Sequence, residues 1–151
     1  MESLEEIAKL CGDWFEKIMN DKPTRRVLAV LGDELLKVVE LDIEILRIDS
    51  EIGLTSLDRP SLARKTHRHI HSNEYLGDIA SRIGLYKHGL DTIKLREDAG
   101  DYIEAVVTAI FYNKGYSEAK KFVYENIINN ENKFKMLLPQ EINKSLKIYP
   151  T

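Results

Sequence analysis

One long apolar segment, residues 24–48, limits what this chain can fold into more than any other feature. Its apolar side chains cover far more than one stripe of a helix, so we expect a helix that is buried on several sides or shared with a partner subunit. Gly32 and Asp33 stand in its middle. A glycine inside a helix costs about 1 kcal/mol relative to alanine, and a buried aspartate is unfavourable unless it is paired or binds a metal. The pair predicts either a kink with a capped aspartate, or close packing at Gly32 and chemistry at Asp33.

A second apolar helix, expected from about residue 98 to residue 113, also contains acidic residues. Asp101 and Glu104 are three residues apart and therefore share one helical face. Two carboxylates on one buried face either have raised pKa values or share a cation. Together with Asp33 they form a set of oxygen ligands suited to a hard cation such as Mg²⁺.

The two segments resemble the signature motifs of the ribonuclease III family. Residues 28–33 read LAVLGD and resemble the family core LEFLGD. Residues 101–105 read DYIEA, and an apolar run leads from them to Asn113-Lys114-Gly115, as in the second acidic motif of the family. The order and separation of the motifs also fit, and the similarity covers about residues 24–128. The resemblance implies one all-α domain, residues 1–151, with the helical fold of the ribonuclease III endonuclease domain.

The same resemblance implies a function. The expected activity is Mg²⁺-dependent cleavage of double-stranded RNA in RNA processing, with Mn²⁺ as an alternative ion. Asp33 and Glu104 are the expected catalytic residues, and Asp33, Asp101 and Glu104 the expected metal ligands. A homodimer would place two sites across the RNA duplex, so that each site cuts one strand and leaves a short 3′ overhang. Four apolar residues are the expected dimer interface: Val27, Val30, Leu31 and Leu35.

Two positions depart from the family pattern. The family has a glutamate where this chain has Ala29, and often a second acid where this chain has Arg26. The chain shares the alanine with the compact Mini-III branch, which lacks a double-stranded RNA-binding domain and which we therefore expect it to resemble most. An alternative is that Arg26 neutralises Asp33, so that the chain is an inactive RNA-binding or scaffolding dimer. A third reading is a helical interaction module without any role on RNA.

One segment, residues 59–71, is strongly basic. Arg64 and Arg68 are four residues apart on one helical face, with Lys65 and His67 beside them. Such a face can contact phosphates, and the segment resembles the RNA-facing pattern of the Mini-III branch. We therefore expect these four residues to bind RNA. Alternatively they form a solvated surface, or His67 and His71 bind a transition metal, although no further ligand stands at a suitable spacing.

The remaining pattern is helical throughout. Ser3 and Glu6 form a capping box, which predicts the start of a first helix. We expect linkers at residues 49–60 and 86–97 and glycine stops at Gly84 and Gly115. No segment has the pattern of a strand. The expected helices, besides the two acidic ones, cover residues 3–19, 73–84, 117–130 and 139–146.

Charge and cysteine content place limits on partners and compartment. The formal net charge of −3 gives no global attraction to nucleic acid, so any contact with RNA requires a local basic patch. Cys11 is the only cysteine, which favours a reducing compartment. The chain has no apolar run of membrane-spanning length, and its first residues lack the positive charge of a signal peptide. We expect a cytoplasmic protein that does not bind membranes, with an organelle as the alternative.

Overall fold

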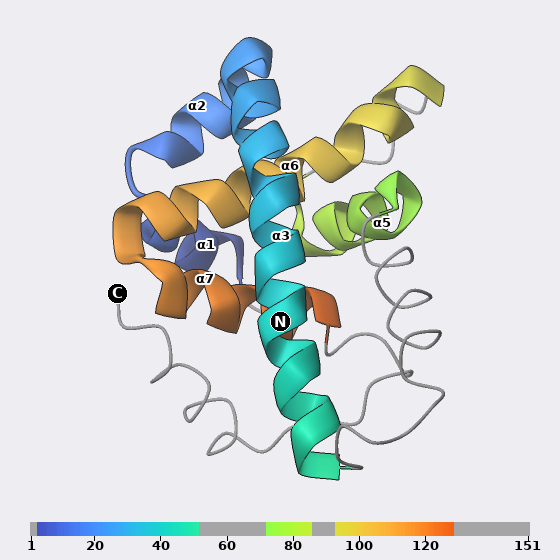
Figure 1. Cartoon of the computed structure of the whole chain (residues 1–151). Helices are drawn as coiled ribbons and strands as arrows, with labels where there is room; N and C mark the ends of the chain where they lie inside the picture. Colours follow the sequence, from blue (N-terminus) through green and yellow to red (C-terminus); the bar gives the residue numbers. More distant parts are fainter. Residues whose placement is uncertain (1–2, 52–71, 86–92, 129–151) are drawn as a thin grey trace.

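A computed structural model of the chain describes residues 3–51, 72–85 and 93–128, and in these ranges every regular element is a helix (Figure 1). The all-α class is therefore confirmed for the described part of the chain. None of its helices is both long and apolar enough to cross a membrane. The predicted linker beyond residue 51 and the predicted helix 139–146 lie outside the described residues. The elements are α1 (Leu4–Cys11), α2 (Trp14–Asn20), α3 (Lys22–Glu51), α5 (Asn73–Ile83), α6 (Ile93–Lys114), α7 (Tyr116–Val123) and the π-helix η2 (Tyr124–Ile128).

Helix α6 occupies the centre of the fold. It contacts α1, α2, α3, α5 and α7, and Figure 1 shows it passing behind α3. Between Ile103 and Ile110 every side chain is buried, so the helix has no solvent-facing side there. The sequence predicted that the helix over residues 24–48, which is α3, is either buried on several sides or shared with a partner subunit. For the single chain the first alternative is wrong. Helix α3 leaves apolar side chains exposed along one face: Val27, Val30, Leu31, Val38 and Leu41.

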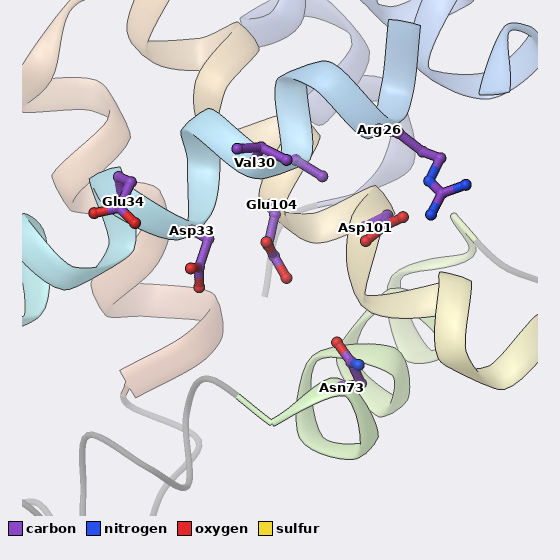
Figure 2. Close-up of a pocket in the computed structure, with 8 residues that line it drawn as sticks. Arg26, Val30, Asp33, Glu34, Asn73, Asp101 and Glu104 are labelled. Atoms are coloured by element: carbon purple, nitrogen blue, oxygen red, sulfur yellow. The ribbon is translucent and has the colours of Figure 1, made fainter. Parts of the chain in front are cut away.

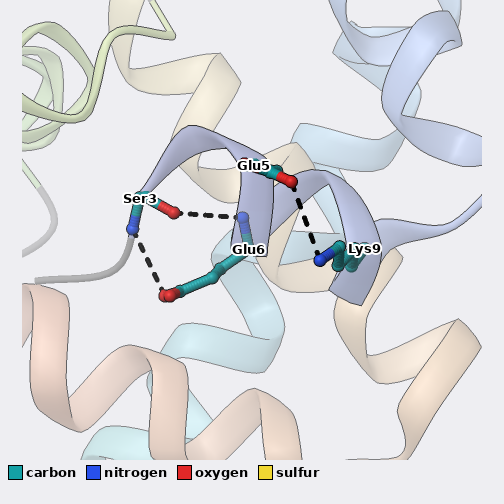
Figure 3. A network of polar contacts seen from close by, with 4 residues as sticks. All are labelled: Ser3, Glu5, Glu6 and Lys9. Atoms are coloured by element: carbon teal, nitrogen blue, oxygen red, sulfur yellow. Dashed lines mark hydrogen bonds and ion pairs between the residues drawn. The ribbon is translucent and has the colours of Figure 1, made fainter.

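The first predicted helix is divided into two. The capping box is confirmed, because the Ser3 hydroxyl accepts from the Glu6 amide at 3.2 Å and the Glu6 carboxylate accepts from the Ser3 amide at 3.4 Å (Figure 3). The continuous helix 3–19 is wrong, because the chain bends at Gly12, whose φ is 61°. A side chain there would also meet Asn113, whose amide donates to the Leu10 carbonyl at 2.9 Å. The bend thus allows Asn113 of α6 to form a hydrogen bond with the last turn of α1.

Other helix ends agree with the sequence to different degrees. Gly84 ends α5 in the left-handed conformation, and Gly115 separates α6 from α7, as predicted. The linker predicted for residues 86–97 is wrong in its last part, because α6 already begins at Ile93. Helix 117–130 begins at Tyr116 and changes to the π-helix at Tyr124.

A buried ion pair joins α3 to α7. Lys120 is completely buried, and its ammonium group pairs with the carboxylate of Asp42, which is 6% exposed. The Tyr116 hydroxyl donates to the same carboxylate at 2.9 Å. Burial lowers the pKa of Lys120 below its ordinary value of 10.5, while Asp42 acts in the opposite direction. Because a lone buried charge is strongly unfavourable, the position of α7 against α3 depends on this pair.

We predict that Asp42→Asn lowers the free energy of unfolding at pH 7 by about 3–5 kcal/mol, because it leaves the Lys120 charge without its partner. In the variant the folded protein releases the Lys120 proton at lower pH than the unfolded chain does. Stability should therefore rise as the pH approaches 10.5, and the difference from the wild type should shrink. Urea denaturation at neutral and alkaline pH measures both effects. Lys121→Met, at the exposed neighbour, is the control.

Candidate functional site

An open pocket of about 390 Å³ lies where α3 crosses α6 beside the first turn of α5 (Figure 2). In Figure 2 the Asp33 and Glu104 carboxylates point into the same space, whereas Asp101 lies nearer Arg26. The three carboxylates singled out in the sequence therefore border one pocket. Its lining consists of Arg26, Ala29, Val30, Asp33 and Glu34 from α3, Asn73 from α5, and Asp101 and Glu104 from α6.

Close contact between the two helices sets the positions of these carboxylates. A Cβ atom at Gly32 would lie 1.9 Å from the backbone oxygen of Glu104. One turn away, the Thr108 hydroxyl donates to the Leu28 carbonyl at 2.7 Å, which links the helices a second time. The packing expected at Gly32 is therefore present, and it brings Asp33 and Glu104 to the same crossing.

A lysine one turn further along α3 already pairs with the site. The Lys37 ammonium lies 3.3 Å from Asp33 and 3.0 Å from Glu34, and both contacts raise its pKa. In Figure 2 Glu34 lies on the far side of Asp33 from Glu104. Glu104 is only 7% exposed, whereas the Asp33 side chain is 36% exposed. The site thus combines one buried carboxylate with one at the surface.

A basic residue, Arg26, borders the other end of the pocket, beside Asp101. Burial raises the pKa of Asp101 above its ordinary value of 3.8, and the nearby charge of Asp98 adds to the rise. Arg26 has the largest opposing effect on this pKa, ahead of Arg25 and Lys22. Arg26 therefore lowers the pKa of Asp101, whereas Asp33 forms an ion pair with Lys37.

The carboxylate oxygens of Asp33 and Glu104 are suitable ligands for a hard cation. Among the described residues no group of three or more histidine, cysteine or acidic side chains lies together so that it could bind a metal ion. Mg²⁺ does not need such a group, because one or two carboxylates commonly hold it while water and substrate phosphates complete its shell. An open pocket lined by two carboxylates that point into the same space meets that requirement. Metal binding by Asp33, Asp101 and Glu104 stays a prediction.

The other predicted residues have different outcomes. Arg64, Lys65, His67 and Arg68 lie outside the described residues, so RNA binding by them stays a prediction. Leu35 is partly buried and packs against the core, unlike the other three residues of the expected interface. Sequence reasoning missed Asn73, whose place beside the pocket follows from packing. Its only local signal is its position after Ser72, the N-cap of α5.

Comparisons of the chain with profiles of protein families, with curated protein sequences and with solved structures give no match. The resemblance to ribonuclease III therefore rests on the two sequence motifs.

We predict that Gly32→Ala lowers the free energy of unfolding by about 3 kcal/mol or more, because the new methyl group forces α3 away from α6. The same movement separates Asp33 from Glu104, so Mn²⁺ binding measured by electron paramagnetic resonance should weaken as well.

Gly100→Ala is the matched control for this change. A methyl group at Gly100 would lie 3.3 Å from the Asn73 side-chain oxygen, a contact that a small shift relieves. This variant should stay within about 1 kcal/mol of the wild type. Equal loss of stability in both variants would contradict the role given to Gly32.

Proposed function

We propose that this chain is a Mg²⁺-dependent endoribonuclease that cleaves double-stranded RNA as a homodimer, with the ribonuclease III-like fold implied by its motifs. The observation that carries the proposal is that Asp33 and Glu104, one from each motif, line the same open pocket. The two motifs are about 70 residues apart in the sequence. Their meeting at one surface is what a catalytic site built from both would require.

The residues of the pocket have separate roles in this proposal. Asp33 and Glu104 hold the cation, and Asp101 adds negative charge beside them. A bound Mg²⁺ supplies positive charge at the reacting phosphate. The close contact of Gly32 with the Glu104 backbone keeps the two ligands at a constant separation, since neither helix can slide without a steric clash. Because Glu104 is almost completely buried and Asp33 is not, substrate reaches the cation from the open side of the pocket.

The exposed face of α3 supports the proposed dimer. Four apolar residues of this face are each more than half exposed: Val27, Leu31, Val38 and Leu41. With Glu34 in the middle of the series, they follow one another at alternating spacings of four and three residues. This is the spacing of the seam between two packed helices. Val30 lies on the same side of α3 and also lines the pocket. A second copy on this face would border the pocket, which brings the two sites of a dimer into one RNA-binding surface.

A second candidate is an inactive RNA-binding or scaffolding dimer of the same fold. Two observations favour it: Ala29 lines the pocket where the family has a carboxylate, and Lys37 occupies one side of Asp33. An ammonium group in that place competes with a metal ion for the carboxylate. The two candidates share the dimer and the RNA, and they differ only in cleavage.

We predict that the wild-type protein cuts a long RNA duplex in the presence of Mg²⁺ at low salt. Glu104→Gln removes one charged ligand, so its rate should fall by more than about a hundredfold, since even indirect contacts to a metal are worth ten- to a hundredfold. Cleavage is followed by gel electrophoresis of both labelled strands. Glu118→Gln on α7, which does not line the pocket, is the control.

Three results are informative here. Cutting by the wild type and the control alone supports the enzyme. Equal cutting by all three proteins would contradict the assigned site. Duplex binding without any cutting would favour the scaffolding dimer.

We predict that the wild type is a dimer at micromolar concentration and that Leu31→Arg is a monomer, because it places a charge in the centre of the exposed apolar face. Size-exclusion chromatography with light scattering measures the mass directly. Leu4→Arg, at another exposed leucine on α1, should leave the dimer intact. A monomeric wild type would contradict the model in which each subunit cuts one strand.

A further inference from the structure

Among the described residues that line the acidic pocket, Arg26 is the basic one. It extends from α3 on the Asp101 side, away from Asp33 (Figure 2). The two nearby basic residues have other partners: Lys22 pairs with Asp98 at 3.0 Å, and Arg25 donates to the Ile18 carbonyl at 2.8 Å. The guanidinium of Arg25 also lies 4.2 Å from the centre of the Tyr102 ring. Arg25 is buried, whereas Arg26 is exposed and borders the open side of the pocket.

The pocket therefore has two ends of different chemistry. At one end Asp33 and Glu104 face a common space, which suits a cation. At the other end Arg26 lies beside Asp101, whereas Asn73 lies across the pocket on α5, with its side chain pointing into the pocket. A planar guanidinium presents paired N–H donors that match two phosphate oxygens.

A phosphate group suits the chemistry of both ends of the pocket. Four carboxylates line the pocket, so an anion is repelled unless a cation is bound first. Once a divalent cation is bound by Asp33 and Glu104, a phosphate beside it is attracted by the cation and also by the Arg26 guanidinium, which lies beyond Asp101 at the same pocket. A lysine in place of Arg26 would offer charge but not the paired donors.

We propose that Arg26 binds the substrate phosphate next to the cation held by Asp33 and Glu104. This inference deepens the proposed function and rests on it. The ribonuclease III family often has an acid at this position, and in this chain the arginine contacts the substrate instead. The arginine therefore does not inactivate the site. It follows that binding is ordered, with the cation before the phosphate, and that loss of Arg26 weakens phosphate binding without weakening cation binding.

The experiment compares the wild type with Arg26→Ala, Arg26→Lys and the control Arg82→Ala, which removes the same charge from an exposed position on α5. Electron paramagnetic resonance measures binding of Mn²⁺ alone. Calorimetry measures inorganic phosphate binding with and without saturating Mn²⁺. Steady-state kinetics on the RNA duplex with Mg²⁺ separates KM from kcat.

In Arg26→Ala the affinity for phosphate in the presence of Mn²⁺ should fall about tenfold or more, as expected for a charged hydrogen-bonding partner. KM for the duplex should rise, Mn²⁺ binding should be unchanged or tighter, and Arg26→Lys should recover part of the loss. Arg82→Ala should behave like the wild type in every assay.

Two failures can be distinguished. Wild-type affinities for phosphate and RNA in Arg26→Ala, with only tighter Mn²⁺ binding, would overturn the inference and leave Arg26 as a counter-charge to Asp101. A wild type that neither binds nor cuts duplex RNA would overturn the proposed function. In that case a phosphate affinity that still depends on both Mn²⁺ and Arg26 would support the phosphate site itself.

Discussion

The described part of the molecule depends on one steric constraint, the contact of Gly32 with the backbone of Glu104. Helices usually meet through their side chains, at a separation of 8–10 Å between axes. A glycine at the crossing lets two backbones come closer, and every larger residue would push them apart. The crossing sets the distance between α3 and α6, and because α6 contacts most of the other helices, it also sets the frame on which they pack.

This constraint also explains why charge can gather at the crossing. Because the two backbones approach each other closely, the side chains next to the glycine have few possible positions. Asp33 and Glu104 therefore point into one space. Lys37 and Arg26 lie on either side of these carboxylates along α3, one paired with Asp33 and the other acting on Asp101. The pocket is therefore polar at its centre and bordered by positive charge, an arrangement suited to a cation and an anion together.

Sequence reasoning was accurate where a residue has a local physical meaning. Ser3 and Glu6 cap a helix, and Gly84 ends one, because these roles depend on the few residues around them. It failed where distant residues decide. Gly12 lies in a run that otherwise reads as one helix, and its bend allows Asn113 to reach the end of α1. Lys120 reads as a surface residue, yet Asp42, which lies 78 positions earlier in the chain, makes its complete burial possible.

By itself the sequence determined the all-helical class and the acidic helix, and it offered close packing at Gly32 as one of two alternatives. Periodicity and helix-ending residues are encoded locally, which is why they can be read directly. Only the tertiary structure decided that α6 and not α3 is enclosed, that Leu35 is partly buried while Val27 and Leu31 are exposed, and that Asn73 borders the pocket. Those properties depend on which surfaces meet, and in a compact helical fold that is settled by contacts between residues far apart in the chain.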